Sequence, residues 1–178
     1  MSKRKNIIFT GLHIIAWIIF VGLSIEAGGL LVNFFFSLYR PEFIPNLYQK
    51  VDLTEMYSQS QLAFFGMYGF ILSIALLKAY LFYVVVMLQH KLDIEKPFNH
   101  YVAKQITKIS YITLSIGLFS HIAKEVAEGL LIDGFNINAL QGFWVDSEAF
   151  ILMAAVIYVI ATLFSRGVEI QTENDLTI

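Results

Sequence analysis

Four long apolar runs separated by shorter polar segments dominate the sequence. They cover residues 7–38, 62–88, 106–132 and 149–164. A helix that rises about 1.5 Å per residue needs about 20 apolar residues to cross the hydrocarbon layer, and each run reaches or approaches that length. The pattern predicts an all-α integral membrane protein, a single domain over residues 1–178 folded as a compact antiparallel four-helix bundle.

Small and polar residues recur on one face of the first and third runs, at about 100° per residue. In lipid such residues face neighbouring helices, because hydrocarbon offers them no hydrogen bonds. The two stripes are Gly11, Gly22, Glu26, Gly29, Asn33 and Ser37, and Ser110, Thr113, Gly117, His121, Lys124, Glu125 and Glu128. They predict which faces look into the bundle, and they predict that the third helix is the most enclosed.

Composition strengthens the membrane assignment and narrows the chemistry. The chain is 57% hydrophobic and 15% charged, which exceeds the apolar share that one soluble core of this length would use. It has no cysteine, which excludes disulfides, thiol nucleophiles and thiolate metal sites. Catalytic triads, phosphate loops and HExxH motifs are absent, so neither an enzyme nor a cofactor is expected. A net charge of −2 gives no sign of direct nucleic-acid binding.

Basic residues near the ends of the runs predict the orientation. Eight lie on the side that holds the N-terminus, the 89–105 connection and the C-terminal segment: Lys3, Arg4, Lys5, Lys91, Lys96, Lys104, Lys108 and Arg166. The other side has Arg40, Lys50 and Lys124. Since cytoplasmic loops carry the excess of Lys and Arg, we expect both termini in the cytoplasm.

The far halves of the helices hold the strongest candidate site. Glu26 lies about 28 Å along the first run and Lys124 about 27 Å along the third, so the two could pair at similar depth. The predicted ligand or ion-pair pocket consists of Glu26, His121, Lys124, Glu125 and Glu128. It would bind a cation, a metal or a small polar ligand. A structural ion-pair network, or a third helix that has already left the hydrocarbon by Lys124, explains the same residues, and the spacing matches no tight metal motif.

Two further polar residues lie within the apolar runs. Lys78 is about 15 Å from Leu88, and we expect its side chain to snorkel toward the cytoplasmic headgroups. His13 is expected to be an interfacial or packed histidine, and His90 is the histidine that comes closest to it in depth. A bis-histidine haem is not favoured.

The connection and the tail on the cytoplasmic side carry the remaining signals. Lys96-Pro97-Phe98 breaks the helical pattern, after which Asn99 can cap the third helix. Residues 166–178 read Arg-Gly-Val-Glu-Ile-Gln-Thr-Glu-Asn-Asp-Leu-Thr-Ile. This segment is either a solvated tail or a peptide-like motif that binds a cytoplasmic partner, as an added strand or as a continued helix docking through Val168 and Ile170.

This tail, together with Lys96-Pro97-Phe98 and the basic helix start at Lys104 and Lys108, resembles domain-of-unknown-function family 2975, small bacterial four-helix membrane proteins. The family's typical ending is similar to the string from Arg166 to Ile178. Its members are often encoded beside a very small helix-turn-helix repressor-like protein. The resemblance therefore implies a membrane protein that holds or modulates such a regulator at the inner surface.

These observations lead to one hypothesis and two alternatives. The hypothesis is a sensor or membrane anchor in the bacterial inner membrane, whose partner-binding residues are Lys96, Pro97, Phe98, Arg166, Glu169, Gln171, Glu173 and Asp175. The first alternative is a small transporter or ion-binding protein in which Glu26, Lys124 and Glu128 line a pathway, reached through dimerisation. The second is a structural accessory subunit of a larger membrane complex.

Overall fold

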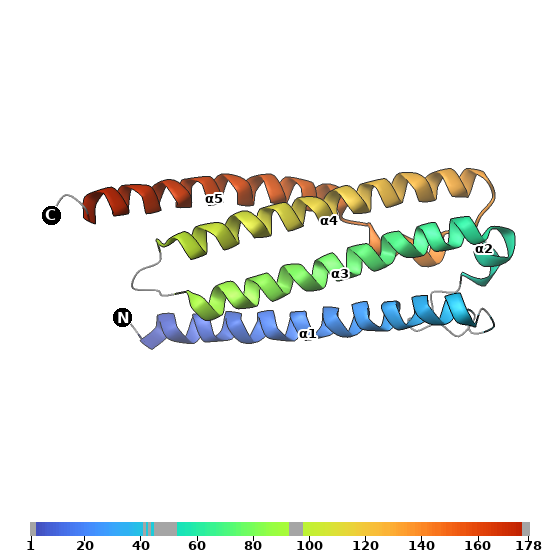
Figure 1. The fold of residues 1–178 in the computed structure, drawn as a ribbon, viewed down its shortest axis with the longest axis horizontal. Coiled ribbons are helices and arrows are strands. Elements are labelled where there is room, and N and C mark those ends of the chain that lie inside the picture. Colours follow the sequence, from blue (N-terminus) through green and yellow to red (C-terminus); the bar gives the residue numbers. More distant parts are fainter. Residues whose placement is uncertain (1–2, 41, 43, 45–52, 93–97, 176–178) are drawn as a thin grey trace.

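Four long helices and two short ones make up a computed structural model of the chain (Figure 1). It describes all residues except 1–2, 41, 43, 45–52, 93–97 and 176–178. The helices are α1 (Lys3–Tyr39), α2 (Thr54–Gln59), α3 (Gln61–Lys91), α4 (His100–Ile132), the 3₁₀ helix η3 (Asn138–Phe143) and α5 (Ser147–Asp175). The prediction of four helices long and apolar enough to cross a membrane is confirmed.

The ends of the helices show where local sequence decides and where it does not. The side chain of Asn99 accepts a hydrogen bond of 2.9 Å from the backbone N–H of Val102, which confirms the predicted cap and starts α4 at His100, before the apolar run. At its other end, α5 does not stop with the apolar run at residue 164 but continues as a helix to Asp175. The predicted tail is therefore an extension of α5 as far as it is described.

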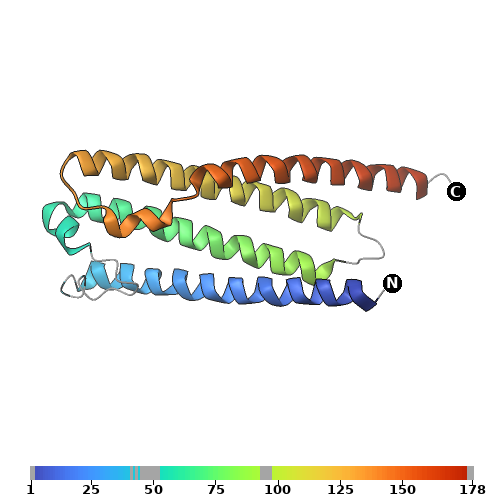
Figure 2. The same ribbon diagram turned by 180° about the vertical axis from the view of Figure 1, so that it is seen from behind.

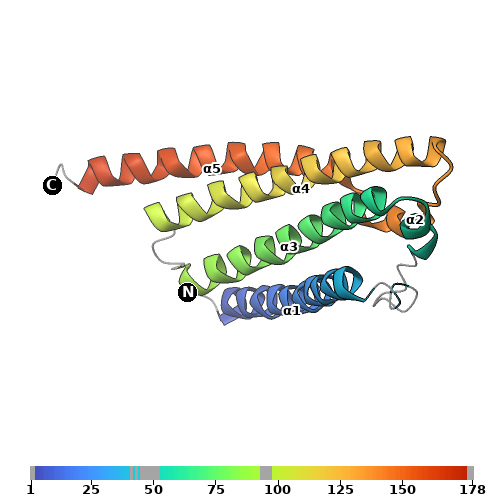
Figure 3. The same cartoon turned by 45° about the vertical axis from the view of Figure 1, so that its right-hand side comes forward.

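The long helices lie in a row that follows their order in the chain. The substantial contacts are those of α1 with α3, α3 with α4, and α4 with α5, and Figures 1 and 3 show the same succession from two directions. Both termini lie at the same end of the molecule, where α5 extends beyond α3 and α4 (Figures 1 and 2). We call this end the terminal end. The arrangement is more open than the expected compact bundle, because α3 and α4 separate α1 from α5.

A glycine sets where α5 begins. A Cβ atom on Gly117, halfway along α4, would lie 2.6 Å from the Cγ1 atom of Ile151 and 2.9 Å from its backbone nitrogen. Only glycine allows α5 to approach α4 this closely. Nearby, the hydroxyl of Ser110 donates a hydrogen bond of 2.9 Å to the carbonyl of Ala154. The first turn of α5 is thus held beside the middle of α4.

Because α5 starts at mid-height, residues 133–146 return along the molecule instead of crossing its far end. The return begins at Gly134, whose φ of +90° suits a residue without a Cβ. Helix η3 then packs on α3 (Figure 2), and the side chains of Leu140 and Trp144 are buried. This segment adds a further layer at the end that carries α2.

Packing divides the molecule into two regions. We call residues 27–75 and 118–146 the head, and residues 7–26, 76–92, 98–117 and 147–175 the stem. The buried apolar residues described in the head form one cluster, which includes Phe64, Tyr68 and Trp144. The tyrosine hydroxyl of Tyr68 donates a hydrogen bond of 3.1 Å to the carbonyl of Leu30 on α1. Among the described residues of the stem, the buried cluster consists of Leu81, Val84, Ile112 and Ile116, and large apolar side chains face outward in both regions.

Candidate functional site

The polar residues of the candidate site in the head lie around Lys124. Its ammonium lies 3.8 Å from a carboxylate oxygen of Glu148, in the first turn of α5. The side chains keep 38% and 76% of their surface exposed, so water weakens this ion pair considerably. Nevertheless it connects the head to the start of α5.

A hollow of about 300 Å³ adjoins this ion pair. Lys124 and Glu128 line it from α4, and Gln141 and Trp144 line it from the returning segment. The remaining lining is apolar: Ala127, Leu131, Ile137 and Val145. An ammonium, a carboxylate, an amide and an indole around a space of this size suit a small molecule that carries both polar and apolar groups.

The other predicted pocket residues lie elsewhere. His121 and Glu125 are exposed on α4 and do not line the hollow. Glu26 is half-buried on α1, and the ion pair with Lys124 that similar depth suggested is not among those formed by the described residues. The structure therefore brings together Lys124 and Glu128, with Glu148 beside them. Within the described ranges, no three His, Cys, Asp or Glu side chains come close enough to hold a metal ion.

The terminal end contains a second candidate site, an aromatic contact between the start of α4 and the end of α5. The ring centroid of Phe98 lies 4.8 Å from that of Phe164. A Cβ on Gly167 would lie 3.0 Å from two ring carbons of Phe98, so the ring rests on the surface that this glycine leaves free. Phe98 from the turn and Gly167 from the tail are thereby packed against each other.

This contact leaves polar side chains of the tail exposed. Arg166 donates a hydrogen bond of 2.8 Å to Glu169, one turn further along α5. Glu169, Gln171 and Glu173 are exposed, whereas Val168 is buried. Arg166 and Glu169 also line a polar hollow of about 290 Å³ between α4 and α5. Lys96, Pro97 and the side chain of Asp175, also predicted to bind a partner, lie outside the described part of the chain.

Two contacts within the stem involve His13 and Lys78, the polar residues that lie within the apolar runs. The rings of His13 and His90 lie 6.2 Å apart, and His13 accepts a hydrogen bond of 3.1 Å from the indole of Trp17. The ammonium of Lys78 lies 5.7 Å from the ring centroid of Phe150, in the first turns of α5. The ammonium of Lys78 is therefore beside the first turns of α5, and its snorkelling toward the cytoplasmic headgroups stays a prediction.

Several residues of both sites were not identified from the sequence as site residues. Gln141 and Trp144 enter the hollow because the chain returns along α3, and no local pattern predicts that return. Val168 was expected to dock a partner, but Phe164 and Gly167 were not singled out, although their spacing places all three near one face of a helix. This spacing, together with the aromatic residue Phe98 before the third helix, is the sequence pattern that predicts the aromatic contact.

Comparisons with known proteins give a family but no characterised relative. A family model described as Protein of unknown function (DUF2975) matches residues 47–178, which include the turn and the tail that carried the resemblance. No curated protein and no solved structure matches the chain.

Proposed function

This chain belongs to the DUF2975 family, and we propose that it is a non-enzymatic protein of the bacterial inner membrane that anchors a small cytoplasmic helix-turn-helix transcription regulator. The observation that carries the proposal is the extension of α5 beyond the apolar run, clamped by Phe98 at Gly167. A segment that is already helical loses less conformational freedom when a partner binds it. The exposed face with Arg166, Glu169 and Glu173 then forms the contact, and Gln171 lies on another side of the helix.

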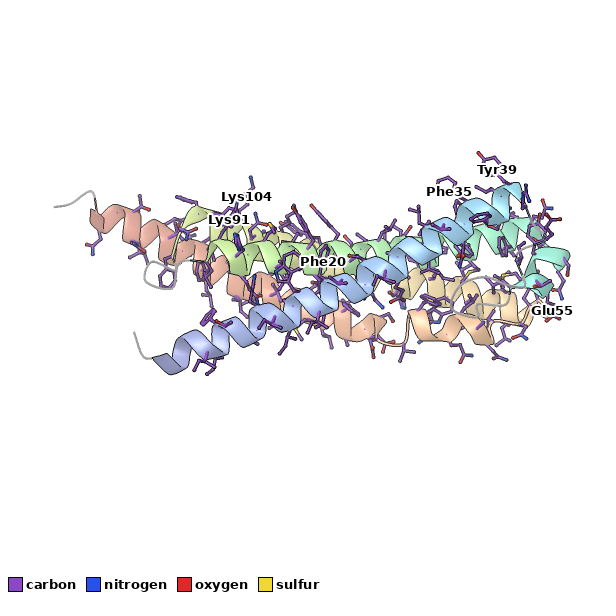
Figure 4. All side chains as sticks on the ribbon, turned by 90° about the horizontal axis from the view of Figure 1, so that it is seen from below. Phe20, Phe35, Tyr39, Glu55, Lys91 and Lys104 are labelled. Carbon is purple, nitrogen blue, oxygen red and sulfur yellow. The ribbon has the colours of Figure 1, made fainter. Side chains whose placement is uncertain are left out.

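In this proposal the four long helices cross the membrane antiparallel, with both termini in the cytoplasm. The charges of the two ends support this orientation. Lys91 and Lys104 lie toward the terminal end, whereas Glu55 lies at the opposite end with Tyr39 (Figure 4). The head also carries Glu128 and Asp133. An excess of basic residues on the side of the tail agrees with the rule for cytoplasmic loops.

The hollow in the head provides a place for a signal. Glu148 is in the first turn of α5 and the partner-binding tail is in its last turns, about 40 Å away along one continuous helix. A ligand that binds beside Lys124 would affect the tail only if it favoured one position of α5 over another. The Lys124–Glu148 ion pair is the contact through which such a preference would act.

The test is recovery of partners from native membranes with four versions of the protein. The first is the full-length chain and the second ends at Ser165. The third is Ile170→Asp, which places a charge on an exposed apolar residue of the tail, and the fourth is the matched control Ile132→Asp in the head. We expect a small DNA-binding protein with the full-length chain and the control, and its loss from the other two.

Other outcomes would contradict the anchor. If all four versions recover the same membrane protein and no soluble regulator, the chain is an accessory subunit. If the version that ends at Ser165 still supports substrate flux and Glu128→Gln abolishes it, the chain is a transporter. Either result would mean that the tail does not bind a regulator.

A further inference from the structure

The stem helices have the length of one hydrocarbon layer. From residue 7 to residue 26, α1 rises about 30 Å, and from Ser147 to Phe164, α5 rises about 26 Å. Polar residues mark both limits of α5, with Asp146 and Glu148 at its start and Arg166 after the apolar run. A bilayer around the stem would place the headgroups of one leaflet at the start of α5.

A groove open to this bilayer runs down the stem. It exists because α5 packs on α4 and makes no substantial contact with α3. Its volume is about 500 Å³ and its lining is almost entirely apolar. Phe82 and Val85 form one wall, Phe150, Met153 and Ile157 the other, and Ile109 of α4 the floor. From Asp146 to Ile157 the groove extends about 16 Å along α5, which suits an acyl chain.

A cation stands at the headgroup end of this groove. The ammonium of Lys78 lies beside Phe150, whose ring lines the groove. No ion pair with Lys78 is formed by the residues that the structure describes. An ammonium at the level of the headgroups attracts an anionic group of a lipid that enters from the bilayer. The carboxylate of Asp146 lines the same end of the groove and would attract an amine next to that anion.

We propose that the groove is a binding site for phosphatidylethanolamine. One acyl chain lies along Phe150, Met153 and Ile157, and the phosphate meets the ammonium of Lys78. The amine of the headgroup lies toward Asp146. The site is independent of the tail and of the regulator, so its test does not depend on the function proposed above.

The experiment compares two lipids on the purified full-length protein. Phosphatidylethanolamine and a diacylglycerol with the same acyl chains are titrated in detergent, and bound lipid is counted by native mass spectrometry. Lys78→Gln is the test variant. Lys108→Gln is the matched control. Lys108 is also half-buried in the stem, and its ammonium also lies over a ring, 4.8 Å from the centroid of Tyr80. Tyr80 and Lys108, however, lie outside the groove.

The full-length protein should bind phosphatidylethanolamine at least tenfold more tightly than diacylglycerol. Lys78→Gln should remove most of this preference, and Lys108→Gln should keep it. Met153→Trp, which fills the groove, should weaken the binding of both lipids. Thermal unfolding of each variant confirms that it is folded.

Three results would overturn the proposal. Equal affinity of the native protein for the two lipids would mean that the groove does not bind the headgroup. If Lys78→Gln kept the preference for phosphatidylethanolamine, or if both lysine variants lost it equally, Lys78 would have no specific role in binding the headgroup. A dimer that Met153→Trp dissociates would show that a second copy, not a lipid, occupies the groove.

Discussion

Phe64 is completely buried in the head, whereas Tyr83, near the other end of the same helix, keeps 43% of its surface exposed. The contrast extends to the contacts between helices. In the head, large side chains such as Tyr68 and Trp144 fill the space. Between α4 and α5 in the stem, the buried residues include small ones such as Ser110, Gly117 and Ala154.

The difference indicates how the helices of each region are held together. Burial of large apolar side chains stabilises a protein when the alternative is exposure to water. In lipid that gain disappears, and helices associate through close approach of small residues and through hydrogen bonds between helices. The surface of the head nevertheless exposes apolar side chains such as Phe35, Phe36 and Ile132, so the contrast between the two regions concerns their interiors.

The largest expected effect tests the core of the head. Phe64→Ala should lower the free energy of unfolding by about 3–5 kcal/mol, because a buried aromatic side chain leaves a cavity. Thermal or denaturant unfolding in detergent measures this loss. Tyr83→Ala in the stem is the control and should lose less than about 1 kcal/mol. Equal losses would show that the two regions are not stabilised differently.

The next effect tests the close contact of α4 with α5. Gly117→Ala should destabilise the protein by about 1–3 kcal/mol, because the added methyl meets Ile151 and its backbone. Gly129→Ala on the same helix meets nothing within 4 Å and should stabilise the protein by about 0.5–1 kcal/mol. The same unfolding measurement compares them, and the idea fails if both changes act in the same direction.

A smaller effect concerns the hydrogen bond between these helices. Ser110→Ala removes the bond to Ala154 and should lower stability by about 0.6 kcal/mol, a typical value for such a bond between membrane helices. Ser115→Ala removes only a bond to the carbonyl of Tyr111 in its own helix. Its effect on the unfolding midpoint should be close to zero, and a loss as large as that of Ser110→Ala would contradict the role of the bond.

The smallest effect is expected at the exposed ion pair. In a double-mutant cycle of Lys124→Gln and Glu148→Gln, the coupling energy should be about 0.5 kcal/mol or less. It should fall further in high salt, since salt screens exposed charges. A coupling that salt does not change would place the pair in a less polar environment than its exposure indicates.

The sequence predicts the stem better than the head. Apolar runs of membrane-spanning length gave the four helices, and Asn99 gave the start of α4, because helix length and caps are local properties. Gly117 was correctly assigned to a face that meets another helix. These features depend on residues within a few turns of one another.

Tertiary arrangement was harder to predict. Depth along each helix suggested a contact of Glu26 with Lys124, but depth does not reveal which helices are neighbours, and the row places α3 next to α1. The carboxylate beside Lys124 belongs to Glu148, brought there by the return of residues 133–146. Of the predicted pocket, Lys124 and Glu128 were therefore found together, and Trp144 could not be foreseen.

The row of helices also bears on biogenesis. Since α3 packs on α1, α4 on α3 and α5 on α4, each long helix made after α1 finds a partner already inserted. Only α1 has to wait in the bilayer for a later helix before it can pack. Contacts between neighbours in the sequence also form faster than contacts between distant segments. Synthesis from the N-terminus can thus assemble the protein one helix at a time.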